Sequence, residues 1–269
     1  MKYKIKQIVE EYKNFIQDGS KYYKDEIIAK LEDAMVSQIK SKGTGIKIVH
    51  GGRSMVSYTG MKGIRCELAD VRFLFYSPVN GTCRLVFLHF EKNRKYRRSG
   101  RIIEIKENHF ELYHSHPDVY SKTKNVYIPE KILQDNKNGF DHSCTMYGII
   151  DGESSKYSIS FAGAEQLKYI SGEKYEYPVS SVVEIKGNAG FEYCSYIPSL
   201  EEFFEQAKEM RIGREIEFKD LHIVLGDMCE MMPDELKILV PKSDNRDMNI
   251  ENKKFQIVNT IFLNVDELE

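Results

Sequence analysis

The stretch that decides the fold is residues 66–92, CELADVRFLFYSPVNGTCRLVFLHFEK, which has the pattern of a β-hairpin. Two runs rich in β-branched and aromatic residues flank Asn80-Gly81, the residue pair preferred in two-residue hairpin turns. If those two residues form the turn, Asp70 faces Glu91 across the hairpin. The sequence therefore predicts two antiparallel strands with a defined register.

The two faces of this hairpin differ in polarity. One face is wholly apolar and consists of Val71, Phe73, Phe75, Val86, Leu88 and Phe90. The other face is apolar near the turn and ends in a polar group, Asp70, Arg72, His89 and Glu91. Opposed Cβ atoms lie ~4.5–5.5 Å apart, and adjacent carboxylates repel unless a cation or a proton lies between them. Asp70 and Glu91 could therefore share one divalent ion; the alternative is a sheet edge where charged side chains enter solvent.

Outside the hairpin, the chain has the periodicities of an α/β fold. Residues 3–40 carry apolar residues at helical spacing, with a break at 18–20. Further strands are expected at residues 46–50, 55–59, 102–105, 145–150 and 157–163. Short helices are expected at 129–136 and at 199–211, the second with Ser199 as its cap. We expect a mixed central sheet flanked by helices.

Length and composition indicate one large body with an added segment. The chain has 269 residues, 41% of them hydrophobic and 12% aromatic, so it can bury a sizeable core. We expect residues 1–195 to form one α/β core, helical over 1–42 and sheet-rich over 45–165. Residues 196–269 are expected to be a partly helical, acidic C-terminal extension that could pack on this core.

Five motifs, in this order, resemble those of a known superfamily. They are IVHGG (48–52), CELAD (66–70), FLHFEKNR (87–94), HFELYHSHPDVY (109–120) and SISFAGAEQL (158–167). The set resembles the PD-(D/E)XK, or restriction-endonuclease-like, nucleases, and more closely a poorly characterised bacterial group of that superfamily. The resemblance covers roughly residues 20–170. It implies a restriction-endonuclease-like core with N-terminal helices.

The resemblance also implies a metal-dependent nuclease that cleaves DNA, in defence or in the handling of mobile DNA. Asp70 would be the central metal-binding carboxylate, Glu67 belongs to the same Glu-Leu-x-Asp motif, and Glu26 matches a helix glutamate that often completes such sites. His89 and Glu91 would be further metal ligands or catalytic groups. One or two Mg²⁺ ions, or Mn²⁺, would activate water and stabilise the pentacovalent phosphate.

The triplet His89-Phe90-Glu91 departs from the family pattern, which has Gln/Glu-x-Lys there. Glu91 cannot replace a lysine that stabilises charge and positions the attacking water. Lys92 is adjacent, but in an ideal strand it points to the opposite face. The alternative function is therefore a catalytically inactive nuclease-fold protein that binds nucleic acid or a protein partner.

A run of positive charge follows the triplet directly. Residues 92–101, KNRKYRRSGR, carry six basic residues and no acidic one, although the whole chain has a net charge of −2. We expect them to contact a nucleic-acid backbone, DNA rather than RNA, through Lys92, Arg94, Lys95, Arg97, Arg98 and Arg101. The alternative is a solvated loop.

Other features bear on partners and location. Residues 199–235 carry eleven acidic and four basic residues, and could dock on the basic run of a second subunit, which leaves a homodimer open. Five scattered cysteines without a CxxC pair fit a reducing compartment. Without a signal-peptide pattern or a run of ~18–20 apolar residues, we expect a cytoplasmic protein with no membrane partner.

His114-Ser115-His116-Pro117 resembles the HxHP motif of JAMM-type zinc metalloproteases. That family has a serine and an aspartate where this chain has Asn125 and Ile128. We therefore expect a strand-to-loop junction that packs Leu112, Tyr113 and Pro117 against the core.

Overall fold

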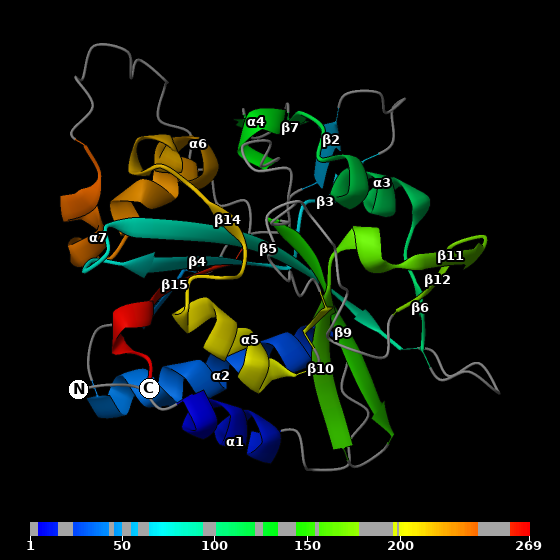
Figure 1. Cartoon of the computed structure of the whole chain (residues 1–269), viewed down its shortest axis with the longest axis horizontal. Coiled ribbons are helices and arrows are strands. Elements are labelled where there is room, and N and C mark those ends of the chain that lie inside the picture. Colours follow the sequence, from blue (N-terminus) through cyan, green and yellow to red (C-terminus); the bar gives the residue numbers. More distant parts are fainter. Residues whose placement is uncertain are drawn as a thin grey trace, which may run out of the picture.

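The computed structural model of the chain shows a mixed α/β architecture, a mixed central sheet flanked by helices (Figure 1). It describes residues 5–15, 24–42, 46–49, 55–58, 65–93, 101–121, 126–133, 144–153, 156–177, 196–197, 199–241 and 259–269. None of the helices in these ranges is both long enough and apolar enough to cross a lipid bilayer.

The central sheet has eight strands within the described residues. They are β1 (Ile46–Val49), β4 (Val71–Ser77), β5 (Thr82–Lys92), β9 (Thr145–Glu153), β10 (Lys156–Ala162), β13 (Tyr196–Ile197), β14 (Arg214–Glu215) and β15 (Asn259–Asn264). The order is β1-β15-β4-β5-β9-β10-β13, with β14 paired to β5. The pairs β15–β4 and β5–β9 are parallel and the others are antiparallel.

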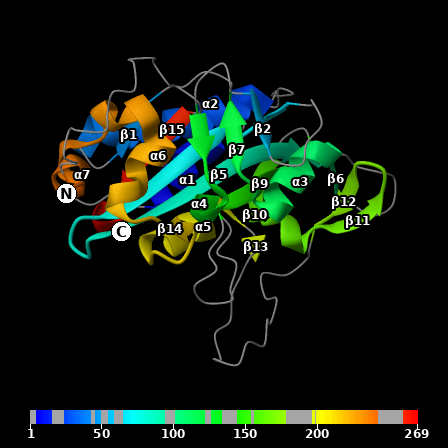
Figure 2. The ribbon, with the colours of Figure 1, turned by 90° about the horizontal axis from the view of Figure 1, so that it is seen from above.

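Helices cover both faces of this sheet (Figures 1 and 2). One face packs against α1 (Ile5–Phe15), α2 (Lys24–Lys42) and α5 (Leu200–Lys208). The opposite face packs against α3 (Glu107–Ser115), α4 (Glu130–Leu133), α6 (Leu221–Leu225) and α7 (Asp234–Leu239). The start of α1 contacts the last residue, because the Ile5 N–H donates to Glu269 O at 3.0 Å.

Two smaller sheets and four 3₁₀ helices complete the described structure. One small sheet has the order β3-β2-β7-β8, and the other has the order β11-β12-β6. Their strands are β2 (Met55–Tyr58), β3 (Cys66–Glu67), β6 (Ile102–Glu104), β7 (Val119–Ser121), β8 (Val126–Ile128), β11 (Lys168–Ser171) and β12 (Lys174–Glu176). The 3₁₀ helices are η1 (Ala164–Gln166), η2 (Phe218–Asp220), η3 (Gly226–Met231) and η4 (Val265–Glu267).

The hairpin register differs from the expected one by two residues. β4 and β5 close at the pair Ser77 and Thr82, so residues 78–81 form a longer turn than the expected two-residue turn. Pro78 explains the difference, because proline has no N–H to donate to the strand ladder. The Gly81 N–H donates to Ser77 O at 2.9 Å, with Gly81 at φ 64°, a left-handed conformation that glycine adopts without strain.

A shift of two residues leaves each side chain on its expected face, because side chains alternate with a period of two. The predicted apolar face is confirmed: its six side chains are all buried in the core beneath α1, α2 and α5. The shift does change the partners across the hairpin. Val71 pairs with Leu88, which brings Asp70 beside His89 rather than beside Glu91.

Strand β15 lies inside the central sheet, between β1 and β4. Ile261, Phe262 and Leu263 have no exposed surface. The expectation that residues 196–269 form an extension is therefore wrong for this strand, which is part of the core. The register pairs Arg72 with Thr260, 188 residues apart in the sequence, and no local pattern of six residues indicates such a pairing.

Residues 107–115 form helix α3, which corrects the expected strand-to-loop junction. The helix ends at Ser115 and is capped by His116, whose φ of 45° is left-handed and whose N–H donates to Leu112 O at 3.2 Å. Leu112 and Tyr113 are buried, as the sequence predicts. The cap of α5 is also as predicted, since the Ser199 hydroxyl accepts from the Glu202 N–H.

Candidate functional site

The site lies where the polar end of the hairpin meets helix α3. Asp70 immediately precedes β4, and its N–H donates to Leu88 O at 2.9 Å, which continues the strand ladder by one residue. His89 and Glu91 lie near the end of β5 and, two residues apart, share one face of the strand. The bond from Asp70 to Leu88 O and the pairing of His89 and Glu91 with β9 therefore set the backbone positions of the three residues.

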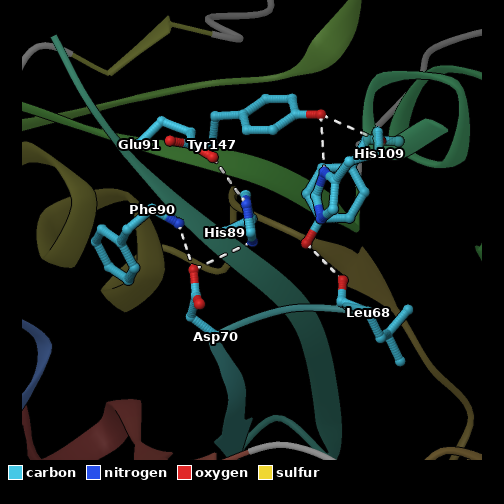
Figure 3. Close-up of polar contacts among 8 residues, drawn as sticks. Leu68, Asp70, His89, Phe90, Glu91, His109 and Tyr147 are labelled. Atoms are coloured by element: carbon cyan, nitrogen blue, oxygen red, sulfur yellow. Dashed lines mark hydrogen bonds and ion pairs between the residues drawn. The ribbon is translucent and has the colours of Figure 1, made fainter. Parts of the chain in front are cut away.

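The Asp70 carboxylate is held by its neighbours on β5 (Figure 3). Oδ2 accepts a hydrogen bond from the Phe90 N–H at 2.7 Å and lies 3.2 Å from His89 Nδ1. The side chain is only 10% exposed. A charge-assisted bond from a backbone N–H stabilises a carboxylate and orients it, so Asp70 is prepared as a fixed anionic group.

His89 lies between two carboxylates. Its Nε2 lies 3.0 Å from Glu91 Oε1, while its Nδ1 faces Asp70. A ring that donates at both nitrogens is an imidazolium, and a neutral ring leaves one nitrogen as an acceptor or a metal ligand. Glu91 is 28% exposed and His89 is 9% exposed, so Glu91 connects this group to solvent.

Glu67 completes a set of possible metal ligands. Donor atoms of Glu67, Asp70 and His89 all lie within 4.8 Å of one another. Glu67 ends β3, which belongs to the small β3-β2-β7-β8 sheet, and the chain turns from there into β4 within four residues. Two carboxylates and one imidazole are a donor set that first-row divalent metals accept.

Three buried aromatic side chains support this group from behind. The His109 ring, from α3, stacks on His89 with centroids 3.8 Å apart. His109 Nδ1 lies 3.2 Å from the Tyr147 hydroxyl, which also contacts His109 O at 3.2 Å. The Tyr113 hydroxyl donates to Leu68 O at 2.9 Å, within the link between β3 and β4. Burial raises the pKa of both tyrosines well above the usual value, so they remain neutral hydrogen-bonding groups.

Sequence reasoning missed these supporting residues for identifiable reasons. His109 and Tyr113 are four residues apart and share a face only if the segment is a helix, whereas a strand was expected. Tyr147 is the parallel-strand partner of His89, and that pairing joins strands separated by α3. Helical spacing of His109, Leu112 and Tyr113 is the local pattern that could have revealed the first two.

The structure separates Glu26, a predicted metal ligand, and Arg72, a member of the hairpin's polar group, from the site. Arg72 is fully buried and bonds elsewhere: its Nε and one terminal nitrogen donate to Thr260 Oγ1 at 3.1 and 2.8 Å, and the other terminal nitrogen donates to Val224 O. Glu26 is an exposed residue of α2, which covers the opposite face of the sheet, and it does not belong to the Glu67, Asp70 and His89 group.

The predicted basic surface is described only at its two ends. Lys92, the last residue of β5, and Arg101, just before β6, are both half-buried. Lys92 follows Glu91 on the strand, so it alternates to the other face. Arg94, Lys95, Arg97 and Arg98 lie outside the described residues.

The two histidines of the HxHP segment do not form a zinc site together. His114 is exposed and its ring packs edge-on against Phe110. His116 is buried after the end of α3, and its Nε2 lies 2.7 Å from Thr145 Oγ1. One ring is exposed and the other is buried against Thr145.

The comparisons with known proteins identify no relative of the chain. The chain matches no protein-family model, no curated protein and no solved structure.

Proposed function

We propose that the protein is a divalent-metal-dependent nuclease that hydrolyses phosphodiester bonds of DNA. The observation that carries the proposal is the convergence of Glu67, Asp70 and His89, whose donor atoms lie within 4.8 Å of one another. Anionic oxygen donors held this close favour a bound cation, because like charges in a partly buried site otherwise repel. Glu67 and Asp70 belong to the Glu-Leu-x-Asp motif of the nucleases that the sequence resembles, and His89 stands where that family has Gln or Glu.

The donor set fits Mg²⁺ and suits Mn²⁺ better. Carboxylate oxygens are ligands of both ions, whereas an imidazole nitrogen is a ligand that Mg²⁺ seldom takes. A divalent ion at this position would polarise a phosphoryl oxygen and favour deprotonation of a water molecule. We therefore expect Mn²⁺ to support activity at least as well as Mg²⁺.

Three side chains of the site have the other roles in the proposed hydrolysis. Asp70, oriented by the Phe90 N–H, provides the fixed negative charge of the site. Glu91 is the most exposed of the three side chains in the Asp70–His89–Glu91 series, so it is the group that accepts a proton from an attacking water. His89, whose Nε2 lies 3.0 Å from Glu91 Oε1, orients the Glu91 carboxylate. The helix α3 behind them excludes water from the inner side.

The preference for DNA rests on charge in the sequence. Residues 92–101 carry six positive charges and begin at the end of the strand that holds His89 and Glu91. Reversal of Arg94, Arg97 and Arg98 to glutamate should weaken DNA binding and flatten its dependence on salt, since each lost phosphate contact removes about 0.9 from the log–log slope. Unchanged binding would remove the support for a nucleic-acid substrate.

A second function follows from one specific residue. Glu91 occupies the position where the family pattern has lysine, and Lys92 alternates to the other face of β5. Because no lysine stands at position 91, the second function is that of a protein that binds a metal and DNA but does not cleave the DNA. Cleavage and binding assays together separate this function from the first.

The deciding experiment is incubation of supercoiled plasmid with purified protein and either Mg²⁺ or Mn²⁺. Asp70→Asn keeps an acceptor for the Phe90 N–H while it removes the negative charge, and it should reduce nicking by at least about 100-fold. Glu67→Gln should also reduce nicking. Glu205→Gln, a half-exposed carboxylate of α5 on the other face of the sheet, is the matched control and should nick normally.

Calorimetric titration of Mn²⁺ into the same variants provides a readout that does not depend on turnover. Asp70→Asn and Glu67→Gln should weaken Mn²⁺ binding, and Glu205→Gln should not. If the native protein binds Mn²⁺ and DNA but cleaves neither single- nor double-stranded substrate with either metal, the non-catalytic function is correct. Absence of Mn²⁺ binding would refute both.

A further inference from the structure

The side chains of the proposed metal site are largely covered by other protein atoms. Asp70 and His89 are 10% and 9% exposed, and Glu67 is half-buried. His109, which stacks on His89, is 4% exposed (Figure 3). Glu91, the neighbour of His89 on the same face of β5, is 28% exposed. A ligand from solvent therefore reaches the site past Glu67 and Glu91.

A phosphate that shares a divalent ion with Asp70 must come very close to this covered carboxylate. Metal–oxygen bonds of Mg²⁺ are about 2.0–2.1 Å long, so a phosphoryl oxygen on the same ion lies within about 4 Å of the carboxylate oxygen. Since Asp70 is only 10% exposed, the phosphate has to enter between the surrounding side chains. A nucleic acid that lies flat across the surface does not bring its phosphates that close.

A paired duplex is poorly suited to this approach. Its persistence length is about 50 nm, so it resists a sharp bend within a site of about 20–30 base pairs. A single strand has no such stiffness, and it can turn one phosphate inward while its bases turn away. The burial of Asp70 and His89 therefore favours an unpaired strand.

Met55 provides a second observation at the edge of the same site. It is the cross-strand partner of Glu67 in the β2–β3 pair, so both side chains lie on one face of the small sheet. The adjacent pair, Val56 and Cys66, is buried on the opposite face. Met55 is 45% exposed, so a flexible apolar side chain lies in contact with solvent beside a proposed metal ligand.

An unpaired base is the part of a nucleic acid that Met55 suits. The thioether of methionine is polarisable and makes favourable contacts with aromatic rings. A duplex offers only the edges of its bases in the grooves, because their faces are stacked on one another. A single strand exposes the faces of its bases, and side chains that pack on them bind with little regard to sequence.

We propose that the substrate of the metal site is single-stranded DNA, or an unpaired stretch within a duplex, with a phosphate at the Glu67, Asp70 and His89 group and a neighbouring base against Met55. The inference rests on the proposed function and specifies its substrate class. A supercoiled plasmid remains a substrate, because negative supercoiling favours local unpairing of the strands. The same plasmid in linear form should resist cleavage.

Cleavage of one labelled oligonucleotide, alone and annealed to its complement, tests the preference. With Mn²⁺ the single strand should be cleaved at least about 10-fold faster than the linear duplex, because the duplex has to open or bend before its phosphate reaches the site. A duplex with an internal unpaired stretch should be cleaved within that stretch.

Binding provides a readout that does not depend on turnover. With phosphorothioate oligonucleotides, which resist hydrolysis, Mn²⁺ should tighten binding of the single strand by at least about 5-fold and change binding of the duplex by less than about 2-fold. Asp70→Asn should abolish this effect of Mn²⁺. Fluorescence anisotropy of the labelled strand measures both.

Variants of an exposed residue test the contact with the base. Met55→Ala should weaken binding of the single strand by about 3-fold or more, and Met55→Leu should weaken it less, because leucine keeps an apolar surface. Met231→Ala, in η3 and 39% exposed, is the matched control and should bind as the native protein does.

The outcomes separate this inference from the function on which it rests. Equal cleavage of single strand and linear duplex, or an equal effect of Mn²⁺ on their binding, would overturn the single-strand substrate and leave the metal-dependent function in place. Failure of the native protein to bind Mn²⁺ would instead refute the proposed function itself. Equal affinity of Met55→Ala and Met231→Ala for the single strand would overturn the contact with Met55.

Discussion

The imidazole rings of His89 and His109 stack on each other, with centroids 3.8 Å apart and planes 30° apart. One ring comes from β5 and the other from α3, so the stack joins the sheet to the helix at the proposed metal site. The Tyr147 hydroxyl, 3.2 Å from His109 Nδ1, holds the second ring in turn. His109 is thus a positioning residue for His89.

Loss of the stacked ring should weaken metal binding. His109→Ala removes the surface against which His89 lies, and we expect Mn²⁺ affinity to fall by about 10- to 100-fold, as for other residues that orient a metal ligand. His109→Phe keeps a stacked ring and should lose much less. Calorimetric titration of Mn²⁺ measures both variants.

Tyr147→Phe should lower metal affinity less than His109→Ala does. It removes the hydroxyl that holds His109 and keeps both stacked rings. A thermal unfolding scan of each variant separates global destabilisation from the local effect. Equal Mn²⁺ affinities in His109→Ala and His109→Phe would show that the stack does not position His89.

Arg72, a member of the hairpin's polar group in the sequence, has a structural role in the folded protein. Its guanidinium connects β4 to β15 through Thr260 and to α6 through Val224 O. Burial lowers the pKa of Arg72 to about 10, because an apolar surrounding disfavours the charged form. Arg72→Met fills most of the same volume but leaves Val224 O without its donor, which should cost about 1–3 kcal/mol of stability.

Chemical unfolding in urea measures this cost. Arg211→Ala is the control, since that side chain is 73% exposed and its ion pair with Glu209 should contribute at most about 1 kcal/mol. Mn²⁺ affinity of the folded Arg72→Met protein should match that of the native protein. An unchanged unfolding midpoint would show that the buried bonds contribute nothing net.

The faces of the hairpin could be predicted from the sequence and its register could not. The alternation of apolar and polar residues can be read from neighbouring positions in the sequence. It placed Phe73 and Leu88 on the face that packs in the core beneath α1, α2 and α5, and His89 on the opposite face. The register depends on the turn, where Pro78 competes with the Asn80-Gly81 preference. The predicted site therefore lay on the correct face of the hairpin. Asp70 was paired with Glu91 in the prediction, whereas the structure places it beside His89.

The remaining differences come from contacts distant in sequence. Helix α3 is nine residues long and mixes polar with apolar positions, so its packing on the sheet decides its conformation. Glu67 was assigned to the site by the motif that it shares with Asp70, and the structure places both near His89, where the chain changes sheets between β3 and β4. Glu26 was assigned to the site by resemblance alone, whereas its helix covers the opposite face.

Removal of β15 should prevent folding. A chain that ends at residue 241 lacks the strand between β1 and β4 and loses three fully buried side chains, Ile261, Phe262 and Leu263. Each large apolar side chain contributes about 2–5 kcal/mol, so their sum is comparable to the whole stability of a domain of about 5–15 kcal/mol. Circular dichroism and thermal scans should show no cooperative transition.

Ile238→Ser is the matched control for the truncation, since Ile238 is 83% exposed and lies in the same C-terminal part of the chain. Its unfolding free energy should stay within about 0.5 kcal/mol of the native value. Cooperative unfolding of the truncated chain would mean that β1 and β4 do not need β15 between them.

Stability should fall steeply at alkaline pH. Burial raises the pKa of Tyr113 and Tyr147 well above 10.0 in the folded protein, and both ionise near the usual value in the unfolded chain. The unfolded state therefore releases protons first, so the stabilisation is complete below about pH 10 and is lost as pH rises beyond it. The two tyrosines together should contribute a loss of about 2.7 kcal/mol per pH unit in that range.

Urea unfolding at a series of pH values from about 8 to about 11 measures this slope. The double variant Tyr113→Phe, Tyr147→Phe has no phenol to ionise at these positions, so its stability should decline less steeply above about pH 10 even if it is less stable at neutral pH. The slope, rather than the absolute free energy, carries the test, because loss of the bond from Tyr113 to Leu68 O lowers stability at every pH. Parallel slopes would mean that these hydroxyls ionise as readily in the folded protein as in the unfolded chain.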